Sequence, residues 1–377
     1  MKPLRVSHVI RLNESPVSPP LSGAENHLLF LLPALAKHGV DVELIVVFGS
    51  LGPLLEETFK KLTGAGVRVT LAPLAREADW HYLGSRVLRR TSELVSLLRS
   101  RKDRIVHIHL DYFGAPIAAW LSGCSKVVMS IHNDEDWLES FRMRVWLRLV
   151  NLMVGRYIAI SNRVRDYFVK VSGARPEKVR RIYYGVEYRN VLPPREARRK
   201  FGIPEDRFVV GFLGRLTYQK NVEVLLEVAR DMPDVHFAIV GEGELRGALQ
   251  ESVRDLNNVQ FLGYQPNGFE AISSFDLFCL PSRFEGLGLV LVEAMIQSVP
   301  IVASRAGAIP EILGNGKYGA LFDVGDLDGL EENIRYLKGD PKAACSMVDL
   351  AREFASSFFT IDKMVAETID VYEKINS

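Results

Sequence analysis

The chain has 377 residues, of which 47% are hydrophobic and 25% charged, a composition typical of a globular enzyme that excludes a disordered or fibrous protein. Its net charge of +1 hides an asymmetry: residues 1–190 carry 28 Lys/Arg and 18 Asp/Glu, a net +10, whereas residues 191–377 carry 19 and 28, a net −9. Three distant cysteines, Cys124, Cys279 and Cys345, form no CxxC pair, which excludes a disulfide framework and a cysteine zinc site.

The elements predicted in chain order alternate between short apolar strands and longer amphipathic helices. The strands expected in the first half are 5–10, 42–48, 67–71, 105–110, 126–131 and 157–160. Those expected in the second half are 208–213, 236–240, 259–262, 277–280, 301–303 and 320–322, with helices at 222–230, 245–256 and 289–297. After Gly339 the pattern predicts helix to the end of the sequence.

This alternation predicts an α/β fold of two doubly wound, Rossmann-like domains that face each other across a cleft. The expected boundaries give an N-terminal domain at 1–190, a C-terminal domain at 191–358, and a final helix at 359–377 that crosses back to the first domain. The breakers Gly185, Pro193 and Pro194 mark the junction.

The segment 280–293 reads as a buried strand, a glycine-rich turn and a helix that begins near Leu287. Free amides at such a helix start can bind a phosphate. If Glu285 and Glu293 are both helical, they lie roughly 12 Å apart along the axis, a spacing that would let them hold hydroxyls on either side of a diphosphate. The alternative is an electrostatic cap at Glu285 and a solvated face at Glu293.

The segment 212–221 places Arg215 and Lys220 directly after the first strand of the second half. Ligands of doubly wound sheets bind at this end of the strands. A guanidinium and an ammonium together suit a diphosphate leaving group, because both stabilise the charge that develops on it. The segment lacks GxGxxG, so it does not indicate a nicotinamide cofactor.

Metal binding is not expected. His107 and His109 lie on one predicted strand, and we expect them to face opposite sides and to form no metal pair. The acidic run 134–136 resembles a string by which some enzymes bind a divalent metal, but we expect it to open the next helix. Arg215 and Lys220 would take the place of a metal.

The motifs GRLTYQKN (214–221), VGEGE (240–244), FLGY (261–264), PSRFEGLGLVLVEAM (281–295) and AIPEI (308–312) resemble the donor domain of GT-B retaining glycosyltransferases of family four. The resemblance covers nearly the whole chain, since SGAE (22–25), HGVDV (38–42), HIH (107–109), SIH (130–132) and AISN (159–162) match the first domain more loosely. Ser22 before Gly23, Tyr184 before Gly185, and Ser298 depart from the family pattern.

The resemblance implies that the domain at 1–190 binds the acceptor and that the domain at 191–358 binds the nucleotide sugar. It also implies roles for individual residues. Arg215 and Lys220 would bind the donor diphosphate, Glu293 the ribose and Glu285 the donor sugar, while His132 would lie beside the reacting sugar. The catalytic candidates are therefore His132 and Glu285. The donor-binding candidates are Gly23, Arg215, Lys220, Gly286, Leu287, Gly288, Leu289 and Glu293.

The function this implies is metal-independent, retaining transfer from a nucleotide diphosphate sugar to a carbohydrate or lipid-linked acceptor, in surface polysaccharide or glycolipid assembly. UDP- and GDP-sugars are favoured over ADP-sugars, no further cofactor is expected, and nucleic acid is not a partner. Two alternatives stay open: a non-catalytic nucleotide-sugar-binding or scaffold protein, and an epimerase or phosphorylase of similar fold.

The location expected is cytoplasmic, because the start of the sequence lacks the apolar core of a signal peptide and no apolar run reaches the roughly 20 residues of a membrane span. The basic first half leaves open a peripheral contact with an anionic surface at the inner membrane face. The segment 137–155 mixes Trp137, Phe141 and Trp146 with arginines, and we expect this helix to face the core rather than a membrane.

Overall fold

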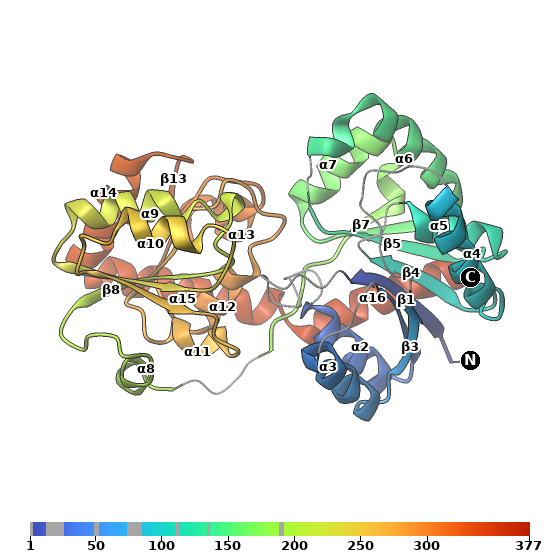
Figure 1. Cartoon of the computed structure of the whole chain (residues 1–377), viewed down its shortest axis with the longest axis horizontal. Helices are drawn as coiled ribbons and strands as arrows, with labels where there is room; N and C mark the ends of the chain where they lie inside the picture. Colours follow the sequence, from blue (N-terminus) through green and yellow to red (C-terminus); the bar gives the residue numbers. More distant parts are fainter. Residues whose placement is uncertain are drawn as a thin grey trace. The chain divides into compact units, whose positions relative to one another are not determined.

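The computed structural model describes residues 3–12, 26–48, 53–73, 85–109, 113–133, 136–187 and 192–377 (Figure 1). By their internal contacts these residues form two compact units. Unit 1 runs to Gly185 and also includes Ile361–Ser377, and unit 2 comprises Val186–Thr360. The sequence analysis placed the boundary between the two domains at 190, which lies outside the described residues, and the start of the final helix after 358.

Unit 1 contains a seven-stranded sheet with the order β3-β2-β1-β4-β5-β6-β7, in which every pair of neighbours is parallel. The strands are β1 (Arg5–Leu12), β2 (Asp41–Phe48), β3 (Arg68–Pro73), β4 (Ile105–His109), β5 (Val127–Ile131), β6 (Arg156–Ala159) and β7 (Val179–Arg181). The order reverses between β1 and β4, which makes this the switch point of a doubly wound sheet.

Helices cover both faces of this sheet (Figure 1). One face carries α2 (Leu28–Lys37), α3 (Pro53–Gly64) and α16 (Ile361–Asn376), and the other carries α4 (Ser85–Arg99), α5 (Gly114–Leu121), α6 (Phe141–Met153) and α7 (Asn162–Ser172). Two short 3₁₀ helices, η1 (Asp136–Glu139) and η2 (Pro176–Lys178), complete the unit.

The last helix, α16, belongs to unit 1, where it packs against α2. Its Tyr372 is fully buried, and Lys126 donates a 2.6 Å hydrogen bond to Asn376 Oδ1. At Gly155 a Cβ atom would lie 2.7 Å from Ile375 Cδ1, so Ile375 of α16 would have to move to admit a side chain there. The continuous helix expected after Gly339 is instead interrupted at Phe359 and Thr360, where α15 ends and α16 begins.

Unit 2 contains a six-stranded parallel sheet with the order β10-β9-β8-β11-β12-β13. The strands are β8 (Phe208–Leu213), β9 (Val235–Val240), β10 (Val259–Gly263), β11 (Leu277–Leu280), β12 (Ile301–Ser304) and β13 (Ala320–Phe322). Every residue of β9 and β11 is buried, as expected for strands covered by helices on both faces. The switch point lies between β8 and β11.

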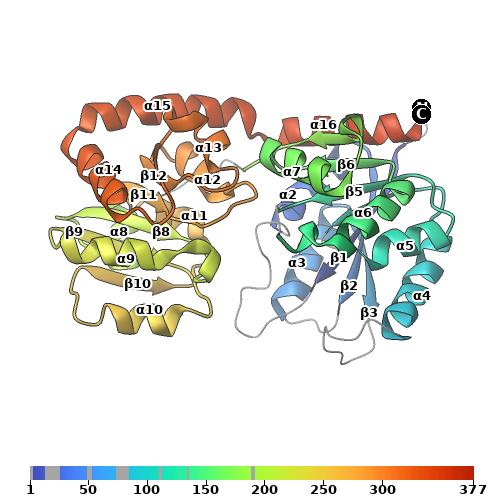
Figure 2. The same cartoon turned by 90° about the horizontal axis from the view of Figure 1, so that it is seen from above.

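The helices of unit 2 also form two layers (Figure 2). They are α8 (Pro194–Phe201), α9 (Val222–Asp231), α10 (Arg246–Ser252), α11 (Gly268–Ile272), α12 (Leu289–Ile296), α13 (Ile309–Ile312), α14 (Leu327–Gly339) and α15 (Pro341–Phe358), with the 3₁₀ turns η3 (Tyr218–Lys220) and η4 (Gly314–Gly316). Among the helices that are described, none has the length and hydropathy needed to span a membrane.

The predicted fold class is confirmed, since both units are doubly wound parallel sheets. All twelve strands that the sequence predicted are present, whereas β7 was missed. With three residues and one of them exposed, β7 is too short to show a periodicity.

A buried ionic network ties the central strands of unit 1 together. Glu43 of β2 accepts hydrogen bonds from Ser7 Oγ at 2.9 Å, Thr70 Oγ1 at 2.7 Å and Arg101 Nε at 2.8 Å. Buried Arg104 donates to Ser7 Oγ at 2.9 Å and to Asp41 Oδ2 at 2.6 Å. Burial alone would raise the pKa of Glu43, but the hydrogen bonds from Arg101, Thr70 and Ser7 lower this pKa to about 2.

Replacing Glu43 with glutamine should lower the free energy of unfolding of unit 1 by about 3 kcal/mol, because Arg101 then loses its compensating charge and Arg104 keeps only that of Asp41. Urea unfolding followed by circular dichroism measures the change. Glu57→Gln is the control, since Glu57 forms an exposed pair with Lys61, and its curve should match the unsubstituted protein. Matching curves for both variants would show that the network adds no stability.

Candidate active site

Two loops meet at the switch point of unit 2, one after β8 (214–221) and one after β11 (281–288). Three hydrogen bonds to backbone oxygens join them: Asn221 Nδ2 donates to Pro281 O at 3.2 Å, Arg283 N to Gln219 O at 2.8 Å, and Gln219 Nε2 to Phe284 O at 3.0 Å. These loops carry most of the residues that the sequence selected for the donor, so the fold brings two separate motifs to one place.

Lys220 and Glu285 form an ion pair across these loops, in which Lys220 Nζ donates to Glu285 Oε1. The same oxygen accepts a 2.8 Å hydrogen bond from Ser282 Oγ. The two charged side chains are only 15% and 7% exposed, so water screens their attraction less than it would screen a surface pair. Ser282 is a contact that the sequence did not reveal.

The backbone of Glu285 is held by a contact with the segment at Gly307 and Ala308. Glu285 O accepts a 2.9 Å hydrogen bond from Ala308 N, and Gly307 beside it has a φ of +53°. A Cβ at Gly307 would lie 2.1 Å from Glu285 O, so only glycine lets the two chain segments approach this closely. The predicted AIPEI motif thus supports the position of Glu285.

The helix expected near Leu287 begins at Leu289 instead, after Gly288 in the left-handed conformation with a φ of 75°. Glu285 therefore precedes α12 while Glu293 lies inside it. The predicted spacing of Glu285 and Glu293 along one helix axis is therefore wrong, because the buried segment Gly286–Gly288 between them is not helical. Glu293 is half-buried, as is Leu289 at the first position of the helix.

Arg215 lies in the same loop as Lys220, directly after β8 and Gly214. Its side chain is exposed, and within the described part of the chain it has no ion-pair partner. It is therefore available to an anionic ligand. Gly23, the remaining donor-binding candidate, lies outside the described residues.

His132 follows β5 in unit 1 and is 2% exposed. Its Nδ1 shares a hydrogen bond with the hydroxyl of Tyr184, whose ring stacks on His27 at a centroid distance of 4.0 Å. Burial lowers the pKa of His132 to about 3, so the ring is neutral near pH 7. Nε2 has no hydrogen-bond partner among the described residues.

The sequence analysis noted Tyr184 only as a departure from the family pattern and did not predict its contact with His132. Its contact with His132 joins positions 52 residues apart, which no local signal predicts. The hydrogen bond to Nδ1 fixes the imidazole ring and leaves Nε2 for another partner.

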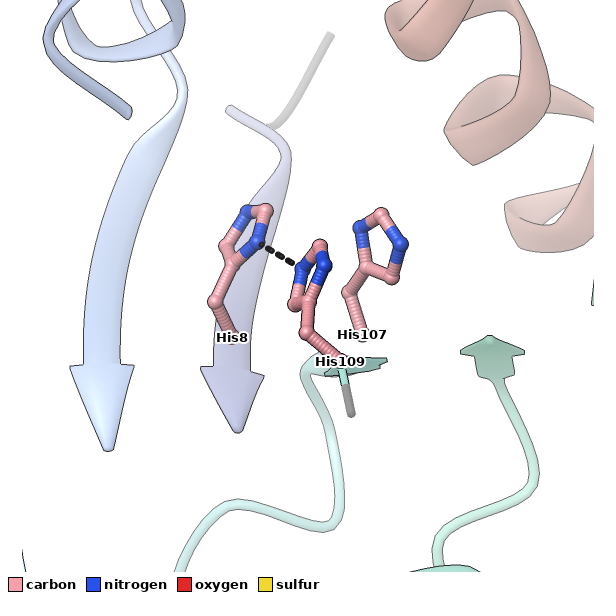
Figure 3. Close-up of side chains that lie close together, drawn as sticks. All are labelled: His8, His107 and His109. Carbon is pink, nitrogen blue, oxygen red and sulfur yellow. Dashed lines mark hydrogen bonds between the residues drawn. The ribbon is translucent and has the colours of Figure 1, made fainter. Parts of the chain in front are cut away.

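His8, His107 and His109 form a buried cluster beside this site (Figure 3). The expectation that His107 and His109 face opposite sides is wrong: their ring centroids are 4.1 Å apart, because residues two apart on a strand share a face. His8 Nδ1 lies 3.0 Å from His109 Nε2. His107 is hydrogen-bonded through Nδ1 to Tyr372 at 2.7 Å and through Nε2 to Ser130 at 2.8 Å.

These three histidines each offer one nitrogen, and the nitrogens lie within 4.8 Å of one another. Imidazole nitrogens bind zinc at about 2.0–2.1 Å, which requires a tighter set than this one. Since both nitrogens of His107 are already hydrogen-bonded, the present contacts fit a polar core network better than a metal centre. Of the acidic run, only Asp136 is described, and it begins η1 as expected.

Two family models match the chain. "Glycosyltransferase Family 4" matches residues 21–189, and "Glycosyl transferases group 1" matches residues 194–354. The chain is a member of the family 4, group 1 glycosyltransferases. This confirms the resemblance seen in the sequence, and glycosyl transfer is the activity of the family.

Two curated relatives indicate the range of substrates within this glycosyltransferase family. A GDP-mannose-dependent alpha-(1-6)-phosphatidylinositol monomannoside mannosyltransferase of Mycolicibacterium smegmatis is 29% identical, over 72% of this chain and 80% of its own. A UDP-Gal:alpha-D-GlcNAc-diphosphoundecaprenol alpha-1,3-galactosyltransferase of Escherichia coli is 28% identical, over 74% and 77%.

Among solved structures, Anabaena HepE in complex with UDP and glucose has a TM-score of 0.79 at 20% identity, covering 98% of this chain and 100% of its own. WaaG, a glycosyltransferase involved in lipopolysaccharide biosynthesis, has a TM-score of 0.73 at 16% identity, covering 97% and 99%. At these identities the likeness establishes the GT-B fold.

The buried histidines make the stability of this glycosyltransferase depend on pH. The pKa values of His8 and His132 are about 3 in the folded state, lowered from 6.5 chiefly by burial, and those of His107 and His109 are lowered in the same direction. The unfolded state therefore binds more protons as the pH falls below 6.5. Unit 1 should lose about 1.4 kcal/mol per pH unit for each of His8 and His132 between that pH and about 3, and His107 and His109 should add to this loss.

Urea unfolding midpoints measured at about pH 7.5, 6 and 5 test this slope, which is the change in the free energy of unfolding per pH unit. His132→Asn should make the slope shallower, whereas His38→Asn, at an exposed histidine, should leave it unchanged. A midpoint that stays constant over this range in the unsubstituted protein would contradict the assignment of these rings as buried and neutral.

Proposed function

We propose that this glycosyltransferase moves a sugar from a nucleotide diphosphate sugar to a carbohydrate or lipid-linked acceptor, with retention of the anomeric configuration and without a metal. The observation that carries the proposal is the shielded pair of Lys220 and Glu285 between two loops at the switch point of unit 2. A cation and a hydroxyl-binding carboxylate side by side suit a phosphorylated sugar.

The diphosphate of the donor would replace Glu285 as the partner of Lys220, because it carries more negative charge than one carboxylate. Exposed Arg215 in the same loop would bind the diphosphate from a second direction, and the amides at the start of α12 would add the positive end of the helix dipole. Together these groups stabilise the charge that develops on the leaving diphosphate, which is the role a metal plays elsewhere.

Release from Lys220 would leave Glu285 free to accept hydrogen bonds from hydroxyls of the donor sugar. Ser282, which also contacts the carboxylate, would hold its orientation. The family pattern assigns the ribose to Glu293, which lies on α12 after this loop. His132 would act as a neutral hydrogen-bonding group beside the reacting sugar, oriented by Tyr184.

The reaction we propose breaks the bond between the anomeric carbon and the diphosphate oxygen and forms the new bond to the acceptor oxygen on the same face. The departing phosphate oxygen takes the proton of the acceptor hydroxyl, so no covalent nucleophile of the protein is needed. The names of both curated relatives describe enzymes that form alpha linkages.

The same relatives support UDP or GDP as the donor nucleotide and a lipid-linked acceptor, since one uses GDP-mannose and the other UDP-Gal with a diphosphoundecaprenol acceptor. We therefore propose a role in glycolipid or surface polysaccharide assembly on the cytoplasmic side of a membrane. The remaining alternative is a scaffold that binds the nucleotide without turnover.

Calorimetric titration with UDP, GDP and ADP tests the donor site. One nucleotide should bind to the unsubstituted protein, and Arg215→Ala or Lys220→Ala should each weaken binding about 10- to 100-fold, the effect of losing a hydrogen bond to a charged group. Arg254→Ala, at an exposed arginine of the same unit, is the control. Binding that survives the double replacement of Arg215 and Lys220 would refute their diphosphate role.

Glu285→Gln should leave nucleotide affinity unchanged or increase it, because Lys220 loses a competing partner, while turnover falls about 100-fold. Slow hydrolysis of the cognate nucleotide sugar without acceptor, followed by proton NMR, reports both the rate and the first anomer released. We expect the alpha anomer from an alpha donor and an unchanged rate in EDTA. Tight nucleotide binding with no hydrolysis and no transfer to any acceptor would favour the scaffold.

A further inference from the structure

Helix α6 presents apolar side chains on two opposite faces. Met143, Leu147 and Val150 are buried against the unit, whereas Trp137 and Phe141, on which the expectation of a core-facing helix was based, are exposed. A second set is exposed to solvent and consists of Phe141, Val145, Leu149 and Leu152. At about 100° per residue, this second set spans only about 80° of the helix surface and lies opposite the first.

The exposure of this second set is large, since Phe141 is 82% and Leu152 83% exposed. Burial of one face suffices to hold a helix on a sheet, so the fold does not explain a second apolar stripe. Large apolar side chains gathered on one surface mark an interaction site more often than scattered ones do.

Neighbouring elements also expose large apolar side chains. Helix α5, which packs against α6, exposes Trp120 and Leu121. Phe113, at the start of α5, stacks with Trp137 of η1 at 6.1 Å and with Trp146 of α6 at 6.0 Å. Within the described residues of unit 1, every exposed large apolar side chain except Leu71 falls between positions 113 and 152. We call this surface, formed by α5, η1 and α6, the α5–α6 face.

Helix α6 is positively charged, while η1 carries the acidic residues Asp136 and Glu139. Helix α6 carries Arg142, Arg144 and Arg148 and no acidic residue, and all three arginines are exposed. Arg142 and Arg148 flank the apolar stripe on its two sides, and neither has an ion-pair partner in the described part of the chain. Arg144 lies 3.7 Å from Glu139 of η1.

We propose that the α5–α6 face docks this glycosyltransferase on an anionic lipid bilayer. Phe141, Leu149 and Leu152 would enter the boundary between headgroups and acyl chains, while the flanking arginines reach lipid phosphates. Exposed tryptophans suit the same depth, because their rings prefer the membrane–water interface. A second copy of the chain fits less well, since a twofold contact would bring the arginines of α6 against themselves.

Docking of this kind would hold unit 1 at the surface where a lipid-linked acceptor resides. Only this link to a lipid-linked acceptor rests on the proposed function, because binding to lipid itself needs no donor and no turnover. The residues of the α5–α6 face are separate from those proposed to bind the donor in unit 2, so the two proposals can fail independently.

Co-sedimentation with vesicles tests the docking. We expect binding to vesicles of phosphatidylglycerol and phosphatidylcholine, little binding to phosphatidylcholine alone, and release as NaCl rises from about 0.05 to 0.5 M. Arg142→Ala and Arg148→Ala should each lower partitioning about fivefold. Replacing both Phe141 and Leu152 with serine should lower it about tenfold or more, because two large apolar side chains can then no longer be buried in the bilayer.

Matched controls come from unit 2. The double variant Tyr336→Ser with Leu350→Ser removes two exposed apolar side chains, and Arg254→Ala removes one exposed arginine. Both should bind vesicles like the unsubstituted protein. Nucleotide titration of the α5–α6 variants should give unchanged affinity, which shows that they are folded and that the donor site is intact.

Three outcomes would overturn the proposal. One is no binding to anionic vesicles at low salt. Another is binding that the α5–α6 variants and the unit 2 variants lower equally. The third is a dimer, seen by light scattering without lipid, that the Phe141 and Leu152 replacements dissociate, which would assign the face to self-association.

Discussion

The candidate active site depends on one ion pair, between Lys220 and Glu285, which connects two loops that are far apart in the sequence. The contact exists because β8 and β11 are parallel neighbours at the point where the strand order reverses, so that their loops emerge at the same edge of the sheet. Without a ligand, each charge satisfies the other in a poorly hydrated place. A ligand that binds here must therefore compensate for breaking this pair, which favours an occupant that offers both a strong anion and several hydroxyls.

The sheet architecture could be predicted from the sequence because buried parallel strands are continuous apolar runs, as in 236–240 and 277–280. The charged donor candidates could be predicted as well, since Arg215 and Lys220 follow a strand end directly. Other features needed the coordinates. The position of Gly288 in the left-handed region delays the start of α12 by two residues, and a glycine-rich sequence does not reveal which glycine adopts that conformation.

Contacts between distant residues were the hardest to predict. The partner of His132 proved to be Tyr184, and the hydroxyl that contacts Glu285 proved to be that of Ser282. The sequence could have predicted that His107 and His109 lie on the same face of the sheet, because residues two apart on a strand share a face. The exposed stripe of α6 was not, since the periodicity of a helix with two apolar faces does not say which one is buried.

Helix α16 has a consequence for how the protein is made. It fills a place in unit 1 beside α2, and its Tyr372 completes the hydrogen bonds of His107, yet it is synthesised after all of unit 2. On the ribosome, the sheet of unit 1 is translated first but lacks this helix until α16 has left the exit tunnel. Unit 2, whose contacts end at Thr360, has all of its parts earlier. The half translated second thus has its complete set of contacts first, and His107 of the other half lacks the hydroxyl of Tyr372 until α16 has been made.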